Sequence, residues 1–233
     1  MLVVSLALYG VDYAMFHRGD EIGFGFMGNL AFLPVYVLFV TLMIERVLKE
    51  RERVAIRQKM NMVIGVFFSE VGTILLRDCF GFIRDAEKLA ARLKITAQWT
   101  AKDFSSIIEF LKGHEILLDS GKGDLAALKA FLVEKRGFML GLLENPNLLE
   151  HDEFTDLLWA VFHLVEELEA RKSLAGLPAA DMDHLSGDIK RAYNYLLHEW
   201  IVYMRHLKKD YPYLFSLAVR TNPMNPDARV EIR

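Results

Sequence analysis

Cysteine is nearly absent from the sequence, in which Cys79 is the single one among 233 residues. One cysteine cannot close a disulfide within the chain, and it cannot supply a cysteine-based zinc site. The neighbouring carboxylate of Asp78 disfavours a thiolate, so a reactive thiol is not expected either. The sequence therefore argues against a disulfide-stabilised fold and against a thiol enzyme.

An excess of positive charge is also absent. The chain has 28 Lys and Arg against 31 Asp and Glu, which gives a formal net charge of −3. Aromatic and basic residues alternate between Tyr193 and Tyr213, a pattern known from single-stranded nucleic-acid binders. Without a basic excess over the whole domain, that stretch is more typical of a helix whose aromatic residues face the core and whose basic residues face water. We therefore expect no nucleic acid among the partners.

Proline is missing between Pro34 and Pro146, and no useful length of strand-like alternation occurs before the last 13 residues. Good helix formers and apolar residues at i, i+3 and i+4 fill the interval instead. The sequence predicts an all-α fold, with a membrane hairpin over residues 1–48 and a cytosolic helical bundle over 96–220. A juxtamembrane helix and an amphipathic helix are expected between them over 49–95, and an extended, mobile tail over 221–233.

Several helix boundaries in the bundle carry local signals. Thr100 and Asp103 form a capping-box pattern for a helix ending near Asp119, and Asp124 is placed to cap the next helix, which ends near Glu144. A four-turn apolar stripe begins near Asp152. Asp181 or Asp183 is expected to cap a further helix that ends near Leu207, and a short docked helix is expected after it.

Charge is absent from the 23 residues between Ile22 and Ile44. A bilayer core needs about 20 apolar residues in a helix, and a helix in a soluble protein normally shows one polar face to water. Pro34 lies in the middle of this run, where a membrane span tolerates proline better than a solvated helix does. The run predicts a transmembrane helix over about 22–44; the alternative is a buried core helix of a soluble protein.

A second apolar segment, of about 1–16, precedes this run and contains Asp12. At about 1.5 Å per residue it covers roughly 24 Å, which is short for a span of about 30 Å. We interpret it as the first arm of a helical hairpin, with both chain ends on the inner side.

Six cations follow the long apolar run closely. Positive charge beside a span marks the cytoplasmic side, and it favours contact with anionic lipid headgroups. These residues, called the basic foot below, predict an inner (plasma) membrane location with the bundle in the cytoplasm; a solvated helix surface is the alternative. The basic foot consists of Arg46, Lys49, Arg51, Arg53, Arg57 and Lys59.

Residues 60–76 have the spacing of an amphipathic helix, but Glu70 interrupts them and their uncharged part is too short to span a bilayer. They predict an interfacial or core helix, with a third span as a less favoured alternative.

Four residues near the C-terminus are candidate metal ligands: His184, Asp188, Glu199 and His206. At about 100° per residue they fall within about 60° of one another along one edge of their helix. Histidine and carboxylate can bind a metal if a facing helix supplies further ligands. The polar residues of the preceding helix, which include His163 and Glu167, lie opposite its apolar stripe and are expected to face water. Ordinary boundary polar groups are therefore the favoured interpretation.

No pattern in the sequence predicts an enzyme or a cofactor. We expect a membrane-anchored scaffold, adaptor or regulatory subunit that acts through an unidentified protein partner. Self-association is an open alternative, although the heptad positions through which two copies of this helix would pair include the polar residues Arg51 and Gln58. Two other functions remain open: a metal- or redox-linked bundle, and a small oligomeric channel or transport accessory with Asp12, Asn29 and Pro34 along its path.

Overall fold

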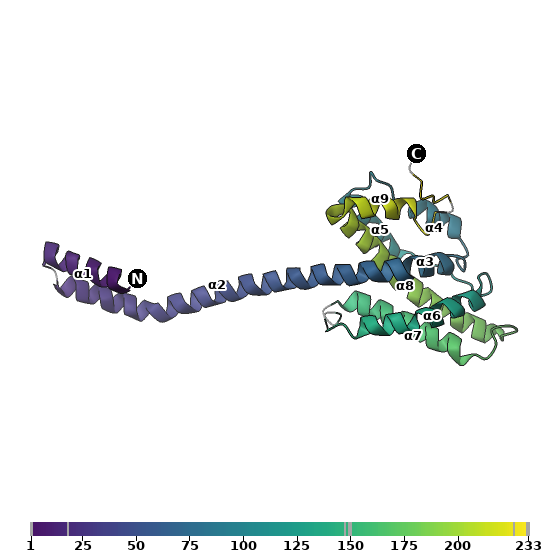
Figure 1. Cartoon of the computed structure of the whole chain (residues 1–233), viewed down its shortest axis with the longest axis horizontal. Coiled ribbons are helices and arrows are strands. Elements are labelled where there is room, and N and C mark those ends of the chain that lie inside the picture. The colour runs from purple at the N-terminus through teal and green to yellow at the C-terminus, as the bar shows by residue number, and fades with distance from the viewer. Residues whose placement is uncertain (1, 18, 147, 149–150, 226, 232–233) are drawn as a thin grey trace. The chain divides into compact units, whose positions relative to one another are not determined.

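The structure is a computed structural model that describes residues 2–17, 19–146, 148, 151–225 and 227–231 (Figure 1). Every regular element in these residues is helical, which confirms the predicted all-α class. One isolated antiparallel bridge pairs Ile83 with Leu118. The chain divides into two compact units, Met1–Ala55 and Ile56–Arg233.

The first unit is a pair of helices joined by a short connection. Helix α1 covers Leu2–Phe16, and α2 begins at Gly19 and continues into the second unit as far as Phe67. The connection contains His17 in a left-handed conformation with φ of 50°. The rings of Tyr9 on α1 and Phe26 on α2 meet edge to face at 6.4 Å, so the two helices lie side by side (Figure 1).

None of the first unit's side chains that the structure describes is buried. Between Phe24 and Ile44 the apolar residues of α2 are exposed all the way round the helix, and Phe24 is 86% exposed. Pro34 lies inside the helix without ending it. Among the described residues, the apolar part of α2 is the one segment long and apolar enough to cross a membrane, while Val3–Phe16 forms a shorter apolar helix.

The second unit begins with the end of α2, a single π-helical segment at Phe68–Gly72, and α3 at Thr73–Phe80. Thr73 Oγ1 donates a hydrogen bond of 2.8 Å to the carbonyl of Phe68, which also accepts the π-helical hydrogen bond from the Thr73 backbone N–H. Of the alternatives for residues 60–76, the core helix agrees with the structure. The fully buried side chains here include Met60, Ile64, Phe67, Val71, Leu75 and Leu76.

The middle of the second unit contains α4 (Ala86–Arg92), α5 (Ala101–Gly113) and α6 (Leu125–Leu143). Thr100 and Asp103 form the expected capping box at the start of α5, and Asp124 caps α6 by accepting from the Ala127 N–H at 2.9 Å. The prediction that α5 continues to Asp119 was wrong. The chain leaves the helix after Gly113 because its backbone pairs with the segment near Phe82, with the Asp119 N–H donating to the Phe82 carbonyl at 2.9 Å.

Helices α7 (Asp152–Ala170), α8 (Ala179–Asp210) and α9 (Pro212–Arg220) complete the bundle. The prediction that Asp181 or Asp183 caps α8 was wrong, because the helix begins at Ala179, directly after Pro178, and Asp181 lies inside its first turn.

The expectation of an extended, mobile tail over 221–233 also needs correction. Asn222 is buried and donates a hydrogen bond of 3.0 Å to the Leu93 carbonyl, and Met224 is buried as well. The first residues after α9 are therefore part of the core.

Candidate functional site

The polar residues of α7 and α8 meet along one line where these two helices pack. The helices run antiparallel, so each step forward along α7 matches a step back along α8. The pairs found in this order are Glu153 with His198, His163 with Asp188, Glu167 with His184, and Arg171 with Asp181. This line positions two groups of titratable residues on the surface of the bundle.

The first group, called the His–carboxylate cluster, consists of His163 and Glu167 from α7 and His184 and Asp188 from α8. His163 Nε2 lies 3.4 Å from Asp188 Oδ1 and 3.9 Å from Glu167 Oε1. His184 Nε2 lies 3.2 Å from Asp188 Oδ2 and 3.5 Å from Glu167 Oε2. Each imidazole therefore faces both carboxylates, and each carboxylate faces both imidazoles.

Asp188 is the buried member of the cluster, with its side chain 2% exposed. Arg191 Nη1 donates to its Oδ1 at 3.0 Å, one turn along α8. Its Oδ2 accepts no hydrogen bond from any residue that the structure describes, despite the ion-pair contact with His184. A buried carboxylate oxygen without a hydrogen bond is costly, so this atom invites a ligand.

Glu167 is held from the other side by Arg171. The guanidinium of Arg171 donates from Nη1 to Glu167 Oε2 at 2.7 Å, and from Nη2 and Nε to Asp181 at 2.6 and 2.9 Å. The hydrogen bond from Arg171 lowers the pKa of Glu167, and contact with His184 lowers it further. The same guanidinium lowers the pKa of Asp181. Both carboxylates are therefore ionised at neutral pH.

The four sequence-predicted metal ligands do not form one group. His184 and Asp188 lie in the cluster, but Glu199 is 11 residues further along the same helix, about 16 Å away, and His206 is further still. His206 instead contacts Asp210 Oδ2 at 2.9 Å and the Asn61 side chain at 3.3 Å.

His163 and Glu167 join the cluster although the sequence placed them toward water. The predicted stripe of α7 omitted Ala160 and Leu164, which are both buried. At about 100° per residue these two extend the buried arc around the helix until the polar line borders it. The sequence does contain a pattern that predicts a partly buried His163, because small and apolar residues flank it on more than one side of the helix.

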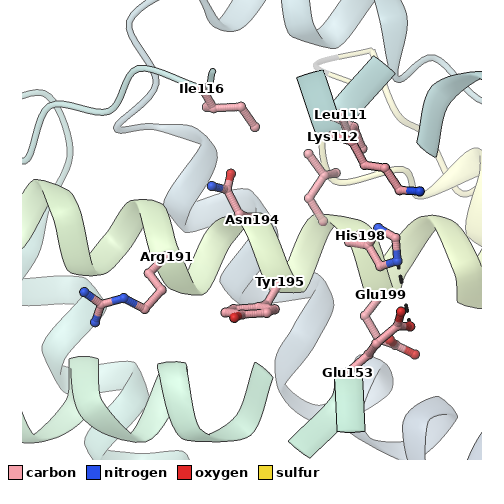
Figure 2. Close-up of a pocket in the computed structure, with 10 residues that line it drawn as sticks. Leu111, Lys112, Ile116, Glu153, Arg191, Asn194, Tyr195, His198 and Glu199 are labelled. Atoms are coloured by element: carbon pink, nitrogen blue, oxygen red, sulfur yellow. Dashed lines mark ion pairs between the residues drawn. The ribbon is translucent and has the colours of Figure 1, made fainter. Parts of the chain in front are cut away.

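The second group lies around a pocket of about 430 Å³ between α5, α7 and α8 (Figure 2). Glu199 and Glu153 bring their carboxylates toward each other at one end of it, where His198 Nε2 contacts Glu153 Oε2 at 3.8 Å. Arg191 and Tyr195 project from α8 further along, so Arg191 connects the pocket with the cluster. The pocket therefore combines an apolar lining with a few titratable groups, as small-molecule sites commonly do.

Glu199 is the unusual residue of this pocket, with 1% of its surface exposed. Its Oε2 has no hydrogen-bond partner among the described residues. Burial raises its pKa to about 7, and the negative charge of Glu153 adds to the effect. Glu199 therefore keeps its proton to a higher pH than an exposed glutamate does.

The remaining sequence candidates lie outside these groups. All six residues of the basic foot are exposed, and Lys49 pairs with Glu45 at 2.7 Å. Asp12 and Asn29 line a cavity of about 500 Å³ within the helix pair, together with Glu21, but Pro34 does not. Burial, and then the charge of Asp78, raises the pKa of Cys79, which agrees with the expected lack of a reactive thiol.

These features describe an all-helical protein with an exposed apolar helix pair and a helical domain that carries a polar cluster. Residues 1–48 match the family model "MJ1433, N-terminal helical domain", and residues 56–220 match "Uncharacterized protein MJ1433, C-terminal helical domain". The chain belongs to the MJ1433 family. It is 42% identical to the protein MJ1433 of Methanocaldococcus jannaschii over 229 residues, which cover 97% of this chain and 90% of that one. No solved structure matches the chain.

Proposed function

We propose that this protein is a membrane-anchored helical protein whose cytoplasmic bundle acts through contacts with another protein. The observation that carries the proposal is the apolar exterior of α2 between Ile22 and Ile44, which contains no charged residue. An apolar surface of this extent is unfavourable in water, because soluble monomers rarely expose large contiguous apolar patches. A lipid bilayer is the solvent that suits it.

The geometry of the helix pair supports a hairpin in the membrane. The edge-to-face contact between Tyr9 and Phe26 pairs α1 with α2, so the shorter α1 packs against a partner. Asp12 and Asn29 are exposed and line the same open groove of the helix pair, so the two polar side chains lie near each other. Polar groups in membranes generally face other helices and not the lipid.

The basic foot supports the orientation. Its six exposed cations directly follow the apolar run, which favours the cytoplasmic side for this end of the span. The bundle, which comes after the foot in the chain, then belongs to the cytoplasm, at the inner membrane.

A contact role is supported by large aromatic side chains on the surface of the bundle. Trp159 on α7 is 62% exposed, although its neighbours Leu157, Leu158 and Ala160 are buried. Tryptophan is enriched among the residues that dominate the binding energy of protein interfaces. Trp159 is therefore the residue that we assign to partner contact.

The anchor is tested in the full-length protein with Leu38→Arg, in the middle of the apolar run. An arginine at the centre of a span costs about 2.5–3.5 kcal/mol on insertion scales. We expect the wild type to stay in the membrane pellet after alkaline carbonate extraction and the variant to be partly released. Val54→Arg, at an exposed position in the foot, is the matched control and should stay in the pellet. Release of the wild type, or equal retention of both variants, would contradict the anchor.

The contact role is tested separately with a photo-crosslinking amino acid at position 159 in native membranes. An exposed polar position on the same helix, Glu166, serves as the control. We expect a discrete adduct with another protein from position 159 alone. Equal labelling from both positions, or none from position 159, would contradict this assignment.

A further inference from the structure

We propose that His163, Glu167 and Asp188, completed by His184, form a binding site for a divalent transition-metal ion of the zinc type. One ligand atom from each of the first three residues lies within 4.8 Å of the others. His184 Nε2 contacts both carboxylates through oxygens that His163 does not contact, Glu167 Oε2 at 3.5 Å and Asp188 Oδ2 at 3.2 Å. The site lies in the second unit and does not depend on the membrane anchor.

The distances within the cluster match those between the ligands of one ion. Ligand atoms about 2.0–2.1 Å from a tetrahedral ion lie about 3.3–3.4 Å from one another. His163 Nε2 lies 3.4 Å from Asp188 Oδ1 and 3.9 Å from Glu167 Oε1, while His184 Nε2 faces the other oxygen of each carboxylate, at 3.2 and 3.5 Å. Small side-chain movements bring these atoms to the required separation, because all four residues project from two packed helices.

Simple histidine–carboxylate ion pairs explain the cluster less well. A charge-assisted N–H···O hydrogen bond is about 2.7–2.9 Å long. The same protein contains one such pair, His206 and Asp210, at 2.9 Å. None of the four contacts in the cluster is that short, although two imidazoles and two carboxylates are available to make them.

The buried oxygen of Asp188 is an independent observation in favour of a ligand. Asp188 Oδ2 accepts no hydrogen bond from the described residues, and the side chain is 2% exposed. A metal ion would satisfy this oxygen, while Arg191 pairs with the other oxygen of the same carboxylate.

Two arginines hold the carboxylates in place from outside the cluster. Arg171 donates to Glu167 Oε2 and Arg191 donates to Asp188 Oδ1. The second oxygen of each carboxylate, Glu167 Oε1 and Asp188 Oδ2, is thereby directed toward His163 and His184, respectively. Outer partners of this kind commonly orient metal ligands and tune their affinity.

The ligand set selects the type of ion. Two imidazole nitrogens and two carboxylate oxygens suit Zn²⁺ and the related ions Co²⁺, Ni²⁺ and Mn²⁺. Mg²⁺ and Ca²⁺ prefer sites built from oxygen alone. We therefore expect Zn²⁺ to bind much more tightly than Mg²⁺.

The test uses the full-length protein in detergent, freed of metal with a chelator and then titrated with Zn²⁺ against a chromophoric competitor. We expect one ion per chain, and visible absorption bands when Co²⁺ is used instead. His163→Gln and His184→Gln should each weaken Zn²⁺ binding by about tenfold or more. The side chains of these two histidines are 43% and 52% exposed, so the variants are expected to fold.

His198→Gln is the matched control, because His198 lies on α8 and contacts a carboxylate but is outside the cluster. It should bind Zn²⁺ as the wild type does. Absence of saturable Zn²⁺ binding in the wild type would overturn the proposal, and so would an equal loss in His198→Gln. Unchanged affinity in both cluster variants, with tryptophan fluorescence showing them folded, would overturn it as well.

Discussion

Replacing Glu199 by glutamine should remove a pH dependence from the stability of the bundle. The carboxyl of Glu199 is buried beside Glu153, and burial raises its pKa from the ordinary value of 4.5 to about 7. The folded state therefore holds a proton that the unfolded state releases between about pH 4.5 and 7. Because the folded state binds more protons in this range, the free energy of unfolding falls as the pH rises through it.

The size of the effect follows from the shift in pKa. A difference of about 2.5 pKa units corresponds to roughly 3 kcal/mol, of which roughly 2–3 kcal/mol falls between pH 5 and 8. Glutamine has nearly the same shape and carries no charge, so the Glu199→Gln protein lacks this loss. Relative to the wild type, the variant should gain roughly 5–10 °C in Tm between pH 5 and pH 8.

The assay is thermal unfolding of the full-length protein in detergent, followed by tryptophan fluorescence. All three tryptophans, Trp99, Trp159 and Trp200, belong to the second unit, so the signal reports on the bundle. Other ionisable groups are present in both proteins, so their effects cancel when the variant is compared with the wild type at each pH.

Two further variants separate the causes. Glu153→Gln removes the second cause of the raised pKa, so it should reduce the pH dependence only in part. Glu166→Gln changes an exposed glutamate on α7 and should behave as the wild type does. A difference in Tm between Glu199→Gln and the wild type that stays constant from pH 5 to 8 would refute the assignment of a raised pKa to Glu199.

Two other predictions concern the packing and capping of the bundle, and both are checked by the same melting experiment. A Cβ atom at Gly123 would overlap the ring of the buried Phe82, so Gly123→Ala should lower the free energy of unfolding by about 1–3 kcal/mol. At Gly137 an added Cβ meets no described neighbour within 4 Å outside its own helix backbone, so Gly137→Ala should be neutral or stabilising. Equal effects of the two glycine variants would contradict the close contact with Phe82. Thr100→Ala removes the side chain that accepts from the Asp103 N–H and should cost about 1 kcal/mol; an unchanged Tm would show that the capping box does not stabilise α5.

The helical elements could be predicted where the local chemistry is strong. Thr100 and Asp103 marked the start of α5, and Asp124 marked that of α6, because side-chain caps satisfy backbone N–H groups within a few residues. The end of α5 could not be predicted in the same way. It depends on the backbone hydrogen bond from the Asp119 N–H to the Phe82 carbonyl, which joins residues far apart in the sequence.

Only the α8 half of the candidate site could be predicted from the sequence. His184 and Asp188 share a helix edge, which a helical wheel shows, but their partners lie on another helix. The sequence does not show how wide the buried face of α7 is. Ala160 and Leu164 are buried because α7 packs against other helices on more than one side, and this brings its polar edge against α8. A single apolar stripe underestimates the buried arc of a central helix, and so it places bordering residues such as His163 in water.

The proposed membrane anchor requires that lipid surrounds α2 between Ile22 and Ile44. The most direct measurement is the accessibility of a spin label at position 38 in reconstituted bilayers, compared with one at position 54. Cys79 is buried, so each introduced cysteine is the preferred site of labelling. We expect the label at position 38 to be reached by oxygen and protected from a water-soluble relaxation agent, with the reverse at position 54. A label at position 38 that the water-soluble agent reaches freely would contradict it.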